Sequence, residues 1–204
     1  PHANTKVKAQ SYLSAAPASV SGKMSCPGIS ISEKRKPRIL IPILPGTCSE
    51  DDLIYPFRQA GGEVQTLVFN NRSTAEISAS LHSLINQLDN TQILAFPGAA
   101  PGFAQAVFSQ PQVALAVNHW LERDHSLILG TGRGFSELLQ LGLLPDGKIK
   151  PASSGDPTLA TNIRGGFIGQ TVSTRFMNAS SPWLDLLIPD QIDRVPIAGE
   201  RGRK

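Results

Sequence analysis

The chain has 204 residues, of which 40% are hydrophobic, 17% charged and 6% aromatic. This length allows one domain with a sizeable core, the hydrophobic fraction excludes a wholly disordered chain, and no apolar run approaches the roughly 20 residues of a membrane-spanning helix. The net charge of +3 comes from short basic clusters near the start and at the end of the chain, without aromatic residues among them, so we expect neither a nucleic-acid nor a membrane partner.

Residues 1–36 differ in composition from the rest of the chain. They are rich in Ser, Ala, Pro and Gly and hold too few large apolar side chains for a core of their own. We therefore expect a linker or extended arm over 1–36 and a globular domain over 37–204. The chain begins with Pro1 rather than Met, which is consistent with a fragment of a longer protein.

The expected compartment follows from two further features. Residues 1–20 hold no apolar stretch of the kind that a secretory signal peptide needs. A domain of this size does not depend on the one disulfide that Cys26 and Cys48 could form. A reduced, cytoplasmic setting is the expectation.

Strands and helices are predicted to alternate after the arm. Short apolar runs rich in β-branched residues predict buried strands, and capped or periodic segments predict helices. Pro42 argues against a central position for the first strand, because proline cannot donate to the ladder. Ser49 is expected to cap the first helix. The expected strands are 38–44, 63–69, 92–96 and 126–129, and the expected helices are 49–60, 74–88, 103–121 with a break at Pro111, and 135–141.

This alternation predicts an α/β fold with a mainly parallel sheet. In such sheets ligands bind beyond the carboxyl ends of the strands, where three glycine-containing turns fall, at 45–48, 97–100 and 130–134. After residue 145 the pattern weakens. A half-exposed strand is expected at 171–177, a turn at 178–183 and a last strand at 194–198.

The turn Gly130–Gly134 joins a predicted strand to a helix through G-x-x-x-G, the layout of a nucleophile elbow. An elbow carries Ser or Cys at its centre, and the following N–H groups stabilise an oxyanion. Here the centre is Gly132, which cannot attack a substrate. Two alternatives stay open: a dinucleotide-binding turn, although Phe135 stands where its third glycine belongs, or a tight connection that binds nothing.

The order of several motifs resembles the glutaminase domain of phosphoribosylformylglycinamidine synthase. Leu127–Phe135, followed by Leu141–Pro145, is similar to that family's Leu-Gly-Ile-Cys-Asn-Gly elbow and its following Leu-Gly-Leu-x-Pro stretch. The resemblance implies a class I glutamine amidotransferase-like fold, which is flavodoxin-like, with an open, mainly parallel sheet and helices on both faces. Further landmarks in the same order are Ile41–Thr47, Ala60–Val64, Phe96–Gly98, Ser181–Leu184 and Val195–Ala198.

The resemblance also implies which catalytic residues this chain lacks. The family's nucleophilic Cys aligns with Gly132 and its neighbouring Asn with Arg133. The oxyanion turn has Ala99 where a second glycine is usual, which leaves Gly98 and Arg133 as remnants of the oxyanion site.

Near the end of the chain the family's catalytic His aligns with Gly199 and its acid with Arg201. A one-residue gap would instead leave Glu200 as a remnant acid. Cys48 follows a different strand from the elbow and is no obvious substitute nucleophile. Surface positions are expected for the four histidines, His2, His82, His119 and His125.

These departures predict a glutaminase-like domain that has lost glutamine hydrolysis, because the thiolate and its base are missing together. It would act as a structural or regulatory domain of the synthase, an ATP-dependent carbon–nitrogen ligase of purine biosynthesis that uses glutamine as amido donor. The resemblance implies a partner synthase domain, in the same or a longer chain, that binds ATP and magnesium, while no cofactor or metal is expected here.

Two alternatives stay open. One is an active amidotransferase, with compensating residues, that supplies ammonia to the synthase. The other is a phosphate- or nucleotide-binding module at 130–134, because Arg133 beside a helix N-terminus would suit an anion.

Overall fold

The computed structural model describes residues 36–163, 165–177, 182–184, 188 and 190–203. The predicted arm therefore lies outside the described residues except for Lys36. Among the described residues, no helix is long and apolar enough to cross a membrane.

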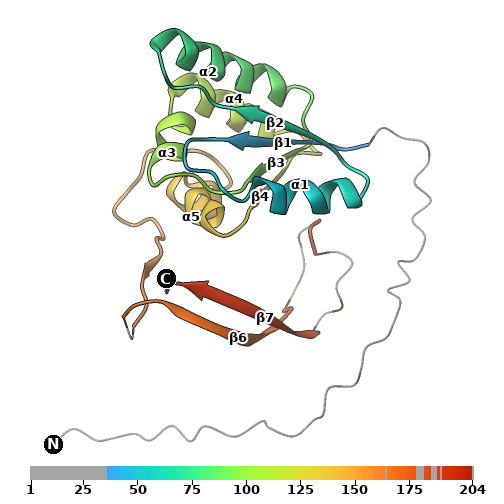
Figure 1. Ribbon diagram of the computed structural model, residues 1–204, viewed down its shortest axis with the longest axis vertical. Coiled ribbons are helices and arrows are strands. Elements are labelled where there is room, and N and C mark those ends of the chain that lie inside the picture. The colour runs from blue at the N-terminus through green and yellow to red at the C-terminus, as the bar shows by residue number, and fades with distance from the viewer. Residues whose placement is uncertain (1–35, 164, 178–181, 185–187, 189, 204) are drawn as a thin grey trace, which may run out of the picture. The chain divides into compact units, whose positions relative to one another are not determined.

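A parallel four-stranded sheet with the order β2-β1-β3-β4 forms the centre of the fold (Figure 1). The strands lie within one residue of the boundaries predicted from their apolar runs. Their bounds are Arg38–Ile43 for β1, Glu63–Val68 for β2, Ile93–Phe96 for β3 and Leu127–Gly130 for β4.

Helices follow the strands as the alternation predicts. Pro111 occupies the first turn of a new helix, where its missing N–H is harmless, so the predicted break is confirmed. The helix after the fourth strand begins at Arg133, two residues earlier than predicted, because Gly132 turns the chain within one residue. The helices are α1 (Glu50–Gln59), α2 (Thr74–Leu88), α3 (Phe103–Phe108), α4 (Pro111–Leu121), α5 (Arg133–Gln140) and α6 (Leu143–Asp146).

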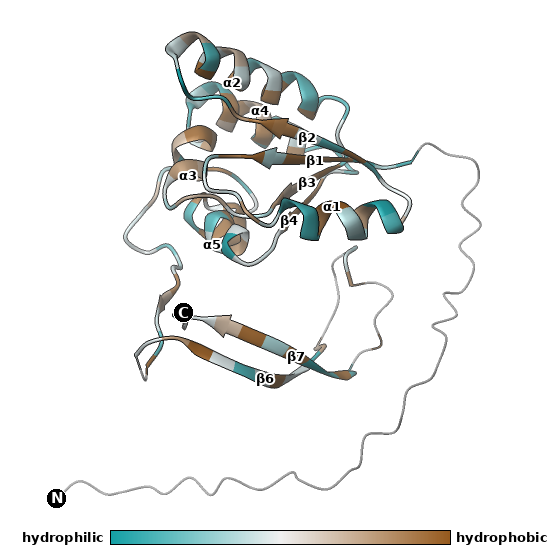
Figure 2. Cartoon of the chain, in the orientation of Figure 1, coloured by the Kyte–Doolittle hydropathy of each residue, from teal (hydrophilic) through white to brown (hydrophobic). Residues whose placement is uncertain are grey.

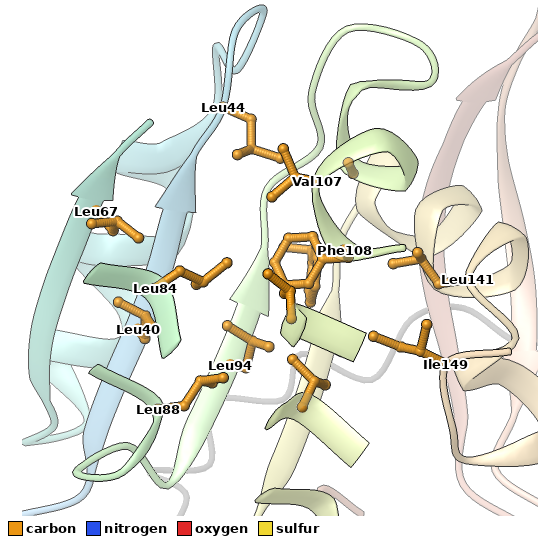
Figure 3. Packing of buried hydrophobic residues seen from close by; sticks show 14 of the residues in the cluster. Leu40, Leu44, Leu67, Leu84, Leu88, Leu94, Val107, Phe108, Leu141 and Ile149 are labelled. Atoms are coloured by element: carbon orange, nitrogen blue, oxygen red, sulfur yellow. The ribbon is translucent and has the colours of Figure 1, made fainter. Parts of the chain in front are cut away.

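Apolar side chains cover both faces of the sheet. On one face Leu40 and Leu94 of the sheet meet Leu84 and Phe108 from the helices (Figure 3). On the other face Leu53 of α1 joins a smaller cluster with Ile39, Ile41, Ile93 and Ala95. Figure 2 shows the apolar residues following the strands while the helices carry polar residues on their outer sides. The predicted α/β fold with helices on both faces is confirmed.

The position of β1 corrects one expectation. Pro42 lies in a central strand and is fully buried. Arg38 O accepts from Gln92 N, so the even-numbered residues of β1 direct their backbone groups toward β3. In β1, the register paired with β3 covers only Ile39 and Leu40. The ladder between β1 and β3 has therefore ended before Pro42, so no hydrogen bond of that ladder requires an N–H from Pro42.

The region after α6 forms two small antiparallel pairs. Strand β6 (Ile168–Arg175) pairs with β7 (Ile192–Gly199), and β5 (Ala160–Thr161) pairs with β8 (Arg201–Arg203). The predicted strands at 171–177 and 194–198 overlap β6 and β7. Of the turn predicted at 178–183, only Pro182 and Trp183 are described, and both lie in a turn.

Candidate functional site

A cavity of about 510 Å³ lies at the carboxyl ends of the sheet strands. The three turns singled out from the sequence all line it, as expected for a parallel sheet. The first helix contributes Asp52 and Leu53 to the same wall. The turn residues that line the cavity are Gly46, Cys48, Ser49, Pro97, Gly98, Thr131, Gly132 and Arg133.

Gly132 forms the vertex between β4 and α5. Its φ of 54° and ψ of −117° lie in a region that side chains rarely adopt. A Cβ built on Gly132 would meet no atom within 4 Å, so a side chain at this position has free space around it. Because Gly132 also lines the cavity, the vertex is open on the side where an elbow presents its nucleophile.

The flanking glycines are required by close packing. A Cβ on Gly134 would lie 2.1 Å from Phe96 O, and one on Gly130 would lie 2.7 Å from Leu138 Cδ1. The Thr131 N–H donates to Phe96 O at 3.1 Å, which holds the elbow against β3. The G-x-x-x-G spacing therefore places glycines where the crowded backbone of an elbow leaves no room for a Cβ.

The turn after β3 packs directly on the elbow. Gly98 has a φ of +96°, and a Cβ there would lie 2.7 Å from Arg133 Cβ. Hydroxyls from the turn after β1 fix its carbonyls: Ser49 Oγ donates to Pro97 O at 3.2 Å, and Thr47 Oγ1 donates to Gly98 O at 3.0 Å. Ser49 stands at the N-cap position of α1, but its side chain makes no cap bond, which corrects the expectation from the sequence.

Arg133 and the buried Glu137 hold the next residue of that turn. Arg133 Nη1 donates to Ala99 O at 3.0 Å, and the Ala99 N–H donates to Glu137 Oε1 at 2.6 Å. Glu137 is only 7% exposed. Burial raises the pKa of Glu137, while the Ala99 N–H and the Arg133 charge lower it.

Glu137 was missed by the sequence analysis. A glutamate in a short helix is ordinarily exposed, so its residue type gave no indication of burial. The one available indication is its place directly before Leu138, which is buried.

Cys48 lies at the carboxyl edge of the sheet, where the sequence places the turn 45–48 together with the elbow. Cys48 is an exposed free cysteine that lines the same cavity as Gly132. The described lining of the cavity contains no histidine. His82, His119 and His125 are exposed, as predicted, while His2 and Cys26 lie outside the described residues.

The C-terminal candidates lie on the small antiparallel pairs. Gly199 ends β7 opposite Ile168, and Glu200 is exposed at the bend before Arg201. Asn162 supports this bend, because its N–H donates to Glu200 O at 3.1 Å and its Nδ2 donates to Gly199 O at 2.9 Å. None of these candidates is among the described residues that line the cavity, and in the described part of the chain no group of three or more His, Cys, Asp or Glu could hold a metal.

A parallel sheet covered on both faces, with a strand-to-helix elbow at a cavity, defines an α/β protein of the nucleophile-elbow class. The CobB/CobQ-like glutamine amidotransferase domain matches residues 36–204, and the chain belongs to this family. The resemblance to a glutaminase domain is thus confirmed.

A solved structure supports the same fold. The chain is similar to a chain in the structure of PurLQS from Thermotoga maritima, with a TM-score of 0.59 and 22% sequence identity over 83% of this chain and 69% of that chain. No curated protein matches the chain significantly.

Proposed function

We propose that this chain is the glutaminase-like domain of a phosphoribosylformylglycinamidine synthase, that it has lost glutamine hydrolysis, and that it serves there as a structural or regulatory domain. The observation that carries the proposal is the vertex of the elbow. Gly132 combines the strained backbone of a nucleophile position with the absence of any side chain.

The chemistry explains why this absence abolishes hydrolysis. Attack on a side-chain amide needs a thiolate, a nearby base to generate it, and donors for the oxyanion. The vertex supplies no sulfur, and no imidazole lines the described cavity. The position aligned with the family's catalytic histidine is Gly199, which cannot act as a base.

The synthase context rests on the similarity to PurLQS and on the order of the sequence motifs. In this context residues 37–204 are the amidotransferase-like domain and residues 1–36 a linker, a division that the family match at 36–204 supports. ATP and magnesium would bind a partner synthase domain, in the same or a longer chain. Such a synthase would work in the cytoplasm and draw its ammonia from free ammonium or another glutaminase.

Cys48 favours a second candidate, an active amidotransferase that uses a different sulfur. Cys48 is a free, exposed cysteine that lines the same cavity as Gly132. The described cavity lining offers it no imidazole, which is why we place this candidate second.

Covalent labelling with a glutamine-analogue electrophile separates the two candidates. We expect no glutamine-protectable adduct on the purified chain when tryptic peptides are analysed by mass spectrometry. Cys48→Ala is the matched variant. An adduct on the unsubstituted chain that glutamine suppresses and Cys48→Ala abolishes would overturn the proposal in favour of the second candidate.

A further inference from the structure

The peptide between Gly98 and Ala99 is fixed at both of its polar atoms, and we propose that Glu137 is the positioning residue that keeps its N–H out of the cavity. We call this unit the pinned peptide. The inference rests on the proposed function and deepens it: the elbow site has lost an oxyanion donor as well as the thiol at its vertex and the base.

The pinned peptide occupies the place of an oxyanion donor. In an elbow site the N–H after the nucleophile works together with an N–H from a neighbouring strand-end loop. Here that loop is the turn after β3, which touches the elbow so closely that a Cβ on Gly98 would lie 3.0 Å from Gly134 N. An N–H turned from this loop toward the vertex would face an oxyanion formed there.

In the structure this N–H points elsewhere. Ala99 is 1% exposed and is not among the described residues that line the cavity. Its N–H donates to the buried Glu137 carboxylate at 2.6 Å. At the other end of the same peptide plane, Gly98 O accepts from Thr47 Oγ1 at 3.0 Å.

A peptide plane rotates as a unit. Turning the Ala99 N–H toward the vertex would break the Thr47 bond together with the Glu137 bond, and it would leave a buried carboxylate without that donor. Arg133 strengthens the arrangement, because its guanidinium holds Ala99 O and its charge favours the Glu137 carboxylate.

The test compares two reactions of one introduced thiol. The background chain carries Gly132→Cys together with Cys26→Ala and Cys48→Ala, so that the introduced cysteine is its one thiol. p-Nitrophenyl acetate acylates this thiolate. The sulfur bonds to the carbonyl carbon, and the ester carbon–oxygen bond breaks to release p-nitrophenolate. Iodoacetamide alkylates the same thiolate by displacing iodide, and no oxyanion forms. The ratio of the two rate constants therefore reports oxyanion stabilisation separately from the accessibility and ionisation of the thiol.

Adding Glu137→Leu should raise this ratio at least tenfold, because a single oxyanion donor typically changes rates by about 10² to 10³. Glu137→Gln is the matched control, since its side-chain carbonyl still accepts the Ala99 N–H, and it should leave the ratio within about threefold of the parent. An unchanged ratio in the Glu137→Leu variant would overturn the proposal. This result is independent of the proposed function, which is tested on the chain with Gly132 in place.

A second measurement decides the matter if Glu137→Leu does not fold. In the unsubstituted chain the Ala99 amide resonance should shift with the protonation of Glu137 in NMR spectra, and this titration should vanish in Glu137→Gln. If the chemical shift of the Ala99 amide in the unsubstituted chain does not change with pH, this result would contradict a hydrogen bond to the Glu137 carboxylate.

Discussion

Gly132 and Gly134 stand two residues apart in the same turn, yet they are glycines for different reasons. Gly132 has an unusual φ with free space around it, whereas Gly134 has no room for a Cβ beside Phe96 O. Backbone conformation therefore limits substitution at the first position, and packing limits it at the second.

This difference predicts unequal effects of alanine. Gly132→Ala should lower the free energy of unfolding by about 1 to 3 kcal/mol, the usual cost of a strained φ. Gly134→Ala lies in a helix, where alanine alone would stabilise by about 1 kcal/mol, but the 2.1 Å approach to Phe96 O should make it the more destabilising variant. Urea denaturation of both variants tests the order, and a Gly134→Ala variant as stable as the unsubstituted chain would contradict it.

The protonation of Glu137 gives a prediction about pH. Because burial raises its pKa, its contribution to stability is fully present below the ordinary glutamate pKa of about 4.3 and is lost as the pH rises through the raised value. The difference in the free energy of unfolding between the unsubstituted chain and Glu137→Gln should therefore fall as the pH rises from the ordinary glutamate pKa through the raised pKa of Glu137. A difference that grows with pH would mean that the Ala99 N–H and Arg133 outweigh burial.

At the scale of the elements, the side chain of Asn118 in α4 makes two hydrogen bonds to the backbone of Ile149, in the segment after α6. Asn118 Nδ2 donates to Ile149 O at 3.0 Å, and the Ile149 N–H donates to Asn118 Oδ1 at 2.7 Å. Ile149 is itself part of the larger core cluster. These two hydrogen bonds from the Asn118 side-chain amide therefore hold Ile149 in the core, although Ile149 belongs to a loop and not to a strand.

Replacing this amide should loosen that segment. Asn118→Ala should destabilise the chain by about 1 to 3 kcal/mol, because it leaves two partly buried backbone groups without their partner. His119→Ala, an exposed neighbour on the same helix, should stay within about 0.5 kcal/mol of the unsubstituted chain. Equal stabilities of the two variants in urea would contradict this role of Asn118.

The sequence predicted the sheet elements well because each strand is a short, buried apolar run with a helix after it. It misplaced β1, since whether Pro42 is tolerated depends on where the neighbouring ladder ends. It did not predict β5, because a pairing of two residues has no periodicity to detect.

The elbow could be predicted from the sequence because its glycines follow a spacing with a backbone cause. Glu137 could not, because its burial depends on how α5 packs against the turn after β3, a contact between residues 38 positions apart. The place of Cys48 at the cavity, by contrast, follows from the prediction that the turns after parallel strands meet at one edge of the sheet.

At the scale of the whole molecule, the family and the fold describe a glutamine amidotransferase domain, while the vertex of the elbow is Gly132, which carries no sulfur. The stability and the fold of the domain do not depend on the missing side chains, because both core clusters are built from residues other than Gly132 and Gly199.

Release of glutamate from glutamine by the purified chain tests the central claim most directly. We predict a rate equal to that of a heat-denatured sample, for both the unsubstituted chain and its Cys48→Ala variant. Glutamate release above that background by the native chain would contradict a lost hydrolysis, whichever side chain supplied the nucleophile.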